Sequence, residues 1–62
     1  MYINLTNQGI TPKKLQKKLK DIKKINISSL DLTFNKLEKE GVKLLTKASC
    51  MQNLTSLYLG NN

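Results

Sequence analysis

Histidine, arginine and tryptophan are absent from this chain of 62 residues, and cysteine occurs once, as Cys50. Without histidine, the sequence offers no Ser-His or Cys-His pair for nucleophilic catalysis and no cluster of zinc ligands. A single cysteine also excludes an internal disulfide. We therefore expect a non-enzymatic protein with no catalytic, cofactor-binding or metal-binding residues. We interpret Cys50 as a small apolar residue rather than a reactive thiol.

Long apolar runs are missing as well. No stretch approaches the length of a membrane span, and residues 1–10 lack the basic start and apolar core of a secretory signal. The expected location is the cytoplasm, although a secreted protein or a part of a larger protein stays open. A chain of this length forms at most one small domain of marginal stability.

The strongest positive signal is an internal repeat. The stretch INISSLDLTFN (25–35) has the same frame as QNLTSLYLGNN (52–62), in which equivalent residues stand 27 positions apart. Leu30, Leu32 and Asn35 recur as Leu57, Leu59 and Asn62. A fainter copy opens the chain, with Ile3 and Leu5 in the leucine columns and Gln8 in the asparagine column. A fixed period of this size is typical of stacked repeats.

The frame, aliphatic-x-x-aliphatic-x-Leu-x-x-Asn, resembles the leucine-rich repeat. The stretches SLDLTFNKLEKEGVKLLTKA (29–48) and NLTSLYLGNN (53–62) are similar to repeats of the ribonuclease-inhibitor and NOD-like-receptor type. This resemblance implies an α/β fold, a right-handed solenoid with parallel strands on its concave face and helices on its convex face. Residues 1–62 would form a partial repeat domain, with repeats at about 3–29 and 30–56 and a truncated third from 57.

The local patterns predict the order β-α-β-α-β. Alternating residues predict strands at 2–6, 28–33 and 56–60. Thr11 and Pro12 are suited to begin a helix through 13–24, whose inward face would carry Leu15, Leu19 and Ile22. A second helix is predicted over 38–48, with Val42, Leu45 and Ala48 facing inward.

The outward strand positions form the predicted partner-binding surface. A protein partner of unknown identity would bind these residues on the concave face. The two tyrosines are candidate contact residues, because tyrosine is favoured at protein interfaces. Phe34, at the bend after the second strand, is expected to pack into the core instead. The surface residues are Tyr2, Asn4, Thr6, Ser29, Asp31, Thr33, Ser56 and Tyr58.

The net charge of +7 allows a second interpretation. Lysines crowd the first helix at positions 13, 14, 17, 18, 20, 23 and 24. A basic docking segment of this kind could bind an anionic membrane, nucleic acid or an acidic protein. The helix has only three apolar residues, which the sheet requires, and no aromatic residue that could stack on bases.

The last predicted feature is a ladder of side chains formed by Gln8, Asn35 and Asn62. An asparagine after each strand can bond to backbone groups and tie successive turns together. The sequence stops at Asn62, within its third repeat, so we expect a fragment of a longer protein. Apolar residues of the third strand would then be under-covered, so we expect either low stability or self-association through that strand.

Overall fold

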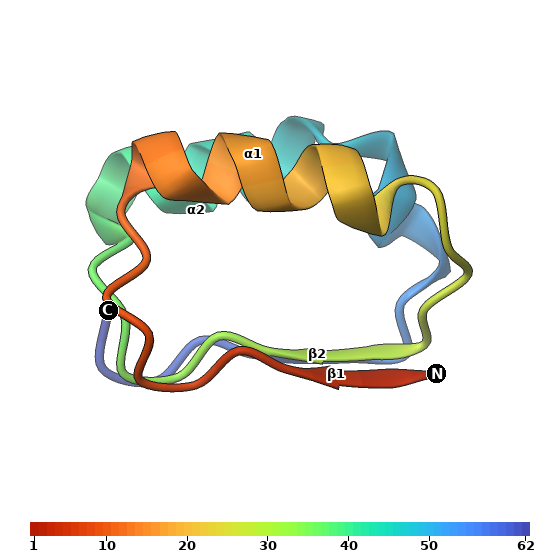
Figure 1. The fold of residues 1–62 in the computed structure, drawn as a ribbon, viewed down its shortest axis with the longest axis horizontal. Helices are drawn as coiled ribbons and strands as arrows, with labels where there is room; N and C mark the ends of the chain where they lie inside the picture. Colours follow the sequence, from red (N-terminus) through yellow and green to blue (C-terminus); the bar gives the residue numbers. More distant parts are fainter.

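The computed structural model describes the backbone of residues 1–62 and every side chain except that of Cys50. The prediction for Cys50 therefore lies outside the described side chains. The element order is β1 (Tyr2–Asn4), α1 (Pro12–Ile22), β2 (Ser29–Asp31), α2 (Glu38–Lys47), the 3₁₀ helix η1 (Ser49–Asn53) and β3 (Ser56–Tyr58). The sheet forms one layer, and both α-helices form a second layer on one of its faces (Figure 1).

The strands form a parallel sheet in the order β1-β2-β3. Ile3 pairs with Leu30, and Leu30 pairs with Leu57, so the pairing register is the sequence period. The predicted α/β class and element order are thus confirmed. The strands are shorter than predicted, but single bonds extend the pairing: Leu5 N–H donates to Asp31 O at 2.9 Å, and Leu32 N–H donates to Tyr58 O at 2.8 Å.

Helix α1 begins as the sequence predicts. The Thr11 hydroxyl accepts a hydrogen bond from Lys14 N–H at 3.3 Å, and Pro12 occupies the first helical position, where its missing N–H costs nothing. Leu15 and Ile22 are buried and Leu19 packs against them, so the predicted inward face is confirmed. The lysines occupy the remaining surface of the helix.

Helix α2 is rotated relative to the prediction. Its buried residues are Gly41 and Leu45, whereas the Val42 side chain is 39% exposed, so the expectation that Val42 faces inward is wrong. A Cβ atom at Gly41 would lie 2.6 Å from Cβ of Leu37, the N-cap residue one turn earlier, so only glycine fits against the Leu37 side chain here. Residues two apart on a helix face nearly opposite sides, so Val42 faces away from Leu44 and α1.

The core lies between the two layers. It is centred on the second repeat, because Leu30, Leu32 and Leu37 are fully buried there between the flanking strands and helices. The complete set of buried apolar residues is Ile10, Leu15, Ile22, Ile27, Leu30, Leu32, Leu37 and Leu45. At about 25 cal/mol per Å², this burial is the main term favouring the fold.

Asn35 is the buried polar residue of this core, with 6% of its surface exposed. Its Oδ1 accepts from the N–H groups of Gln8 and Ile10, both at 3.0 Å. Its Nδ2 donates to Leu5 O at 2.9 Å and Leu32 O at 2.8 Å. One side chain therefore joins the first turn of the chain to the second.

Asn62 repeats this arrangement one period later. Its Nδ2 donates to Leu32 O at 2.9 Å and Leu59 O at 3.0 Å, and its Oδ1 accepts from Leu37 N–H at 3.3 Å. The predicted ladder therefore has two asparagine members. Gln8 enters it through its backbone N–H, and its exposed side chain makes no hydrogen bond among the described residues.

The third strand is under-covered, as the sequence predicts. Leu57 is 39% exposed, whereas Leu30, its equivalent one period earlier, is fully buried. Leu54 and Leu59 are only half-buried, although they contact the core.

Replacing Asn35 tests whether the ladder holds the fold together. Asn35→Ala would leave the N–H groups of Gln8 and Ile10 and the Leu5 carbonyl without this partner, whereas Leu32 O keeps its bond from Asn62. Each buried group left unpaired costs about 1–3 kcal/mol. Because a chain of this size has a free energy of unfolding of about 6 kcal/mol, we expect Asn35→Ala to be largely unfolded in a urea titration followed by circular dichroism. Asn62→Ala is the matched control: Asn62 is exposed and its bonds to Leu59 O and Gly60 O lie at the surface, so the loss should be only about 1 kcal/mol. Equal losses would contradict the account.

Candidate functional site

The face of the sheet turned away from α1 and α2, here called the outer face, carries the residues predicted to bind a partner. The strand register aligns Tyr2 with Ser29 and Ser56, and Asn4 with Asp31 and Tyr58. The backbone near Thr6 and Thr33 stays paired beyond the ends of strands β1 and β2, since Asn7 N–H donates to Thr33 O at 3.0 Å. The rows predicted from the sequence are therefore brought together on one surface.

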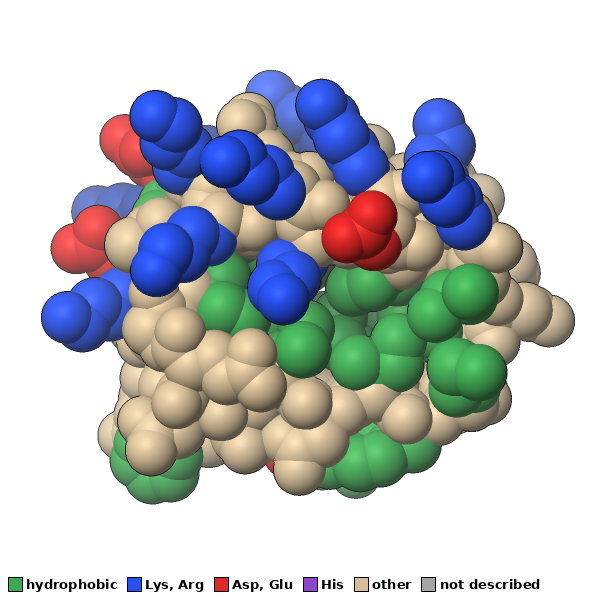
Figure 2. Space-filling view, in the orientation of Figure 1, with side chains coloured by type: hydrophobic (Ala, Val, Ile, Leu, Met, Phe, Trp, Pro, Cys, Tyr) green, Lys and Arg blue, Asp and Glu red, His purple; other side chains and the backbone are tan. Residues whose placement is uncertain are grey.

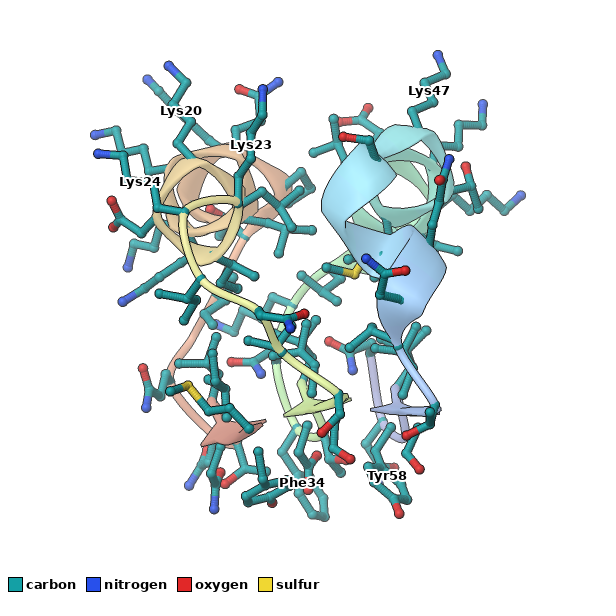
Figure 3. All side chains as sticks on the ribbon, turned by 90° about the vertical axis from the view of Figure 1, so that its right-hand side faces the viewer. Lys20, Lys23, Lys24, Phe34, Lys47 and Tyr58 are labelled. Atoms are coloured by element: carbon teal, nitrogen blue, oxygen red, sulfur yellow. The ribbon has the colours of Figure 1, made fainter. Side chains whose placement is uncertain are left out.

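All three aromatic residues of the chain are exposed. Tyr2, Tyr58 and Phe34 have 55%, 52% and 59% of their surfaces exposed. Figure 3 shows the Phe34 and Tyr58 side chains pointing away from the helices, below the sheet. Tyr2 alternates with the core residue Ile3 and so lies on the same outer face. We call Tyr2, Phe34 and Tyr58 the aromatic patch.

The expectation that Phe34 packs into the core is wrong, and the backbone gives the reason. Phe34 has a φ angle of +59°, in the left-handed region, and this conformation turns its side chain outward. The positions one period away, Asn7 and Asn61, have φ angles of +53° and +57°. Asparagine tolerates this conformation, whereas a bulky aromatic residue rarely adopts it. The asparagines in this column were the signal that could have placed Phe34 correctly.

Asp31 lies at the centre of the outer face and is held in a fixed orientation. Its Oδ1 accepts from Thr33 N–H at 3.0 Å and from the Thr33 hydroxyl. Asn4 and Thr6 form the same turn one period earlier, at 2.9 Å and 2.7 Å. These hydrogen bonds from the Thr33 hydroxyl, then from its N–H, hold the pKa of Asp31 below its ordinary value of 3.8.

Tyr2 reaches the other oxygen of the same carboxylate. Its hydroxyl donates to Asp31 Oδ2 at 3.4 Å, a long contact at the exposed rim of the patch. Desolvation first, and then the negative charge of Asp31, raise the pKa of Tyr2 above its ordinary value of 10.0. The phenol thus stays protonated near neutral pH and can donate a hydrogen bond.

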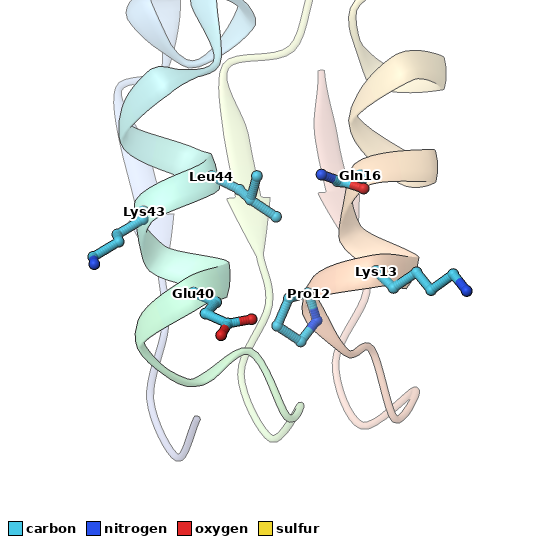
Figure 4. A pocket seen from close by; sticks show the side chains of 6 residues that line it. All are labelled: Pro12, Lys13, Gln16, Glu40, Lys43 and Leu44. Atoms are coloured by element: carbon cyan, nitrogen blue, oxygen red, sulfur yellow. The ribbon is translucent and has the colours of Figure 1, made fainter.

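A shallow hollow lies between α1 and α2, on the other side of the molecule (Figure 4). Its lining is mixed: aliphatic stems, one carboxylate and two lysines, with no set of polar groups converging on a point. We therefore assign no site to it. The lining residues are Pro12, Lys13, Gln16, Glu40, Lys43 and Leu44.

Lysine side chains gather over the helix layer (Figure 2). All seven lysines of the stretch 13–24 are exposed, and Lys20, Lys23 and Lys24 point away from the sheet (Figure 3). The basic surface and the outer face are therefore on opposite sides of the molecule.

Two further kinds of site are absent from the described residues. No group of three or more His, Cys, Asp or Glu side chains there could hold a metal ion. No helix in that part of the chain is both long and apolar enough to cross a bilayer.

Comparison with family models, with curated proteins and with solved structures finds no match to the chain. A proposed function therefore rests on the residues and their geometry.

Replacing Phe34 by the residue found at the equivalent positions should stabilise the protein. Phe34→Asn removes an exposed ring from a left-handed backbone position that costs a bulky residue about 1 kcal/mol. We expect the free energy of unfolding in urea to rise by about that amount. Phe34→Ala is the control: it also loses the ring but lacks the asparagine amide, which can hydrogen-bond locally in the left-handed conformation, and it should show no such gain. Destabilisation by Phe34→Asn would mean that the ring packs within the fold.

The pKa of Asp31 should depend on Thr33. In Thr33→Val we expect this pKa to rise toward its ordinary value, measured by nuclear magnetic resonance titration of the Asp31 carboxyl carbon. The pKa of Asp31 is lower in the folded state than in the unfolded state. The ionised Asp31 carboxylate therefore stabilises the fold at pH values above its unfolded pKa, and this contribution is lost as the pH falls through its folded pKa. Thr6→Val alters the same turn around Asn4 and should leave the Asp31 pKa unchanged; a shift there, or none in Thr33→Val, would refute the assignment.

Proposed function

We propose that the chain is a non-enzymatic protein-interaction module of the leucine-rich-repeat type, which binds a protein partner through its outer face. In a right-handed solenoid of such repeats the outer face would be the concave one. The observation that carries the proposal is the aromatic patch, which holds every aromatic side chain of the chain on one exposed surface.

Support for the repeat assignment comes from bonds that recur with the sequence period. Ser28 N–H donates to Met1 O at 2.9 Å, and Thr55 N–H donates to Ser28 O at 2.8 Å, one period later. Asn35 and Asn62 repeat the same set of side-chain bonds. These pairs are what a stack of translated units requires.

Support for a protein partner comes from the composition and rigidity of the outer face. Tyrosine and phenylalanine are enriched at protein interfaces, because a large ring gives contact area at a small entropic cost. The strands and the turns at Asn4 and Asp31 fix the backbone beneath the rings. Phe34 is kept at a backbone position that disfavours it, and such strain often accompanies function.

The chemistry of the face suggests what the partner presents. The aromatic patch would contact apolar side chains, and the ordered Asp31 carboxylate beside Tyr2 would accept hydrogen bonds from a lysine or arginine. We therefore propose an apolar surface of the partner that carries a basic residue.

Affinity capture with matched variants tests the proposal. The double variant Phe34→Asn, Tyr58→Ser removes two rings from the patch while keeping the backbone. The control Lys17→Gln, Lys20→Gln changes two exposed residues on the opposite side. A partner bound by wild type and control should lose at least tenfold in affinity for the patch variant, measured by calorimetry with the purified partner. Equal affinity for both variants would refute the role of the outer face.

The alternative function is a basic docking segment, favoured by the seven exposed lysines of residues 13–24. It would bind an anionic membrane, nucleic acid or an acidic protein. Binding of that kind weakens steeply with salt, because each neutralised charge releases counterions. Binding that falls with salt and is lost in the Lys17→Gln, Lys20→Gln variant, but not in the patch variant, would favour this alternative.

A further inference from the structure

The two edges of the sheet present complementary sets of backbone groups. Within residues 1–62, β1 and β3 each have a neighbouring strand on one side only. Because the pairing repeats with the sequence period, the groups that β2 presents to β3 recur on the open side of β3, and those that β2 presents to β1 recur on the open side of β1. The open edge of β3 therefore matches the open edge of β1.

Backbone carbonyl oxygens that stand one sequence period apart illustrate this match. Met1 O accepts from the N–H groups of Ser28 and Ser29, at 2.9 Å and 3.3 Å. Ser28 O in turn accepts from Thr55 and Ser56, at 2.8 Å and 3.2 Å. The next acceptor in this column is Thr55 O, and the donors that match it are the N-terminal amine and the Tyr2 N–H of a second copy.

A second set of hydrogen bonds has the opposite polarity, because here each strand donates N–H groups to the strand that follows it. Leu5 N–H donates to Asp31 O, and Leu32 N–H donates to Tyr58 O. Asn7 N–H donates to Thr33 O, and Phe34 N–H donates to Gly60 O. The next donors are Leu59 and Asn61, and the matching acceptors are Asn4 O and Thr6 O of a second copy.

The apolar side chains beneath the edges match in the same way. Leu57, Leu54, Met51 and the neighbouring Thr55 and Ser56 line a shallow hollow beside β3. On the β1 side, Met1 is 66% exposed, and Ile3 and Leu5 are half-buried. A second β1 placed against β3 would set Ile3 beside Leu57, as Leu30 lies beside Leu57 on the other side.

The helix layer is slightly wider than the sheet. Two helices in contact need about 16–20 Å, whereas three strands need about 14 Å, so a stack of copies curves with its helices on the convex side. Helix α1 lies above β1 and α2 lies above β3 (Figure 3). A second copy would therefore bring its α1 directly against the exposed flank of α2 at Val42, without an additional helix between them.

We propose that copies of this 62-residue chain associate head to tail, with β1 of one copy pairing in parallel with β3 of the next. Tyr2, Ile3 and Asn4 of the second copy align with Ser56, Leu57 and Tyr58. The contact is heterologous, so each addition exposes a new β3 edge and the assembly is open-ended. The net charge of +7 on each copy opposes association, and added salt strengthens it by screening. The outer face stays free for a partner.

The wild-type chain provides the first test. Its mass is followed by analytical ultracentrifugation from micromolar to millimolar concentration, and amide exchange is followed by nuclear magnetic resonance over the same range. We expect the mean mass to rise with concentration and with salt, and the Tyr2, Leu59 and Asn61 amides to become protected together. A monomer throughout the range overturns the proposal. Protection of Leu59 and Asn61 without Tyr2 also overturns it, because it indicates symmetric pairing of two β3 edges.

Two variants that each block one edge give the second test. Leu57→Lys places a charge on the β3 edge, and Ile3→Lys places one on the β1 edge. Each variant should be a monomer alone, and an equimolar mixture should form a dimer that grows no further. Tyr2→Lys and Tyr58→Lys add the same charge on the outer face and should still associate as wild type does. Association of Ile3→Lys with itself overturns the head-to-tail arrangement.

Discussion

The fold depends above all on the buried side chain of Asn35. A core this small consists of two layers joined by loops, and the loops bring backbone N–H and C=O groups into the interior, where water cannot reach them. Asn35 provides an acceptor for Gln8 and Ile10 and donors for Leu5 and Leu32. It thereby fixes where the first loop leaves the sheet, and hence where α1 lies over the core.

The sequence predicted those features that follow from the period. Equivalent residues in two copies require equivalent pairing, so the parallel register and the Asn35–Asn62 ladder follow from the residues alone. Val42 was misplaced because helix packing does not follow from the period, and Phe34 was misplaced because the asparagines one period away were not read as a sign of a left-handed backbone. Helix α2 buries Gly41 and Leu45 in place of Val42, and Phe34 combines a left-handed φ angle with an exposed side chain. The sequence predicted the rows of residues on the outer face, including Tyr2 and Tyr58, but it did not predict that Phe34 lies there too.

The regular stacking of repeats that builds the core also places the different surfaces of the molecule on separate sides. Side chains alternate along each strand, so the leucines face the helices and the aromatic patch faces away from them. The lysines of α1 occupy the opposite side, and the strand edges remain at the ends of the sheet. A partner on the outer face and a second copy at an edge would therefore not compete for the same residues.

Hydrogen exchange at the Gln8 and Ile10 amides tests the central role of Asn35 most directly. If Asn35 holds the two turns together, these amides exchange only through global unfolding, with a protection free energy equal to the free energy of unfolding from urea titration. The Lys14 amide, bonded to the exposed Thr11 hydroxyl at 3.3 Å, should exchange much faster and is the internal reference. Exchange of Gln8 and Ile10 as fast as that of Lys14 would show that the first loop opens without unfolding, and would contradict this account.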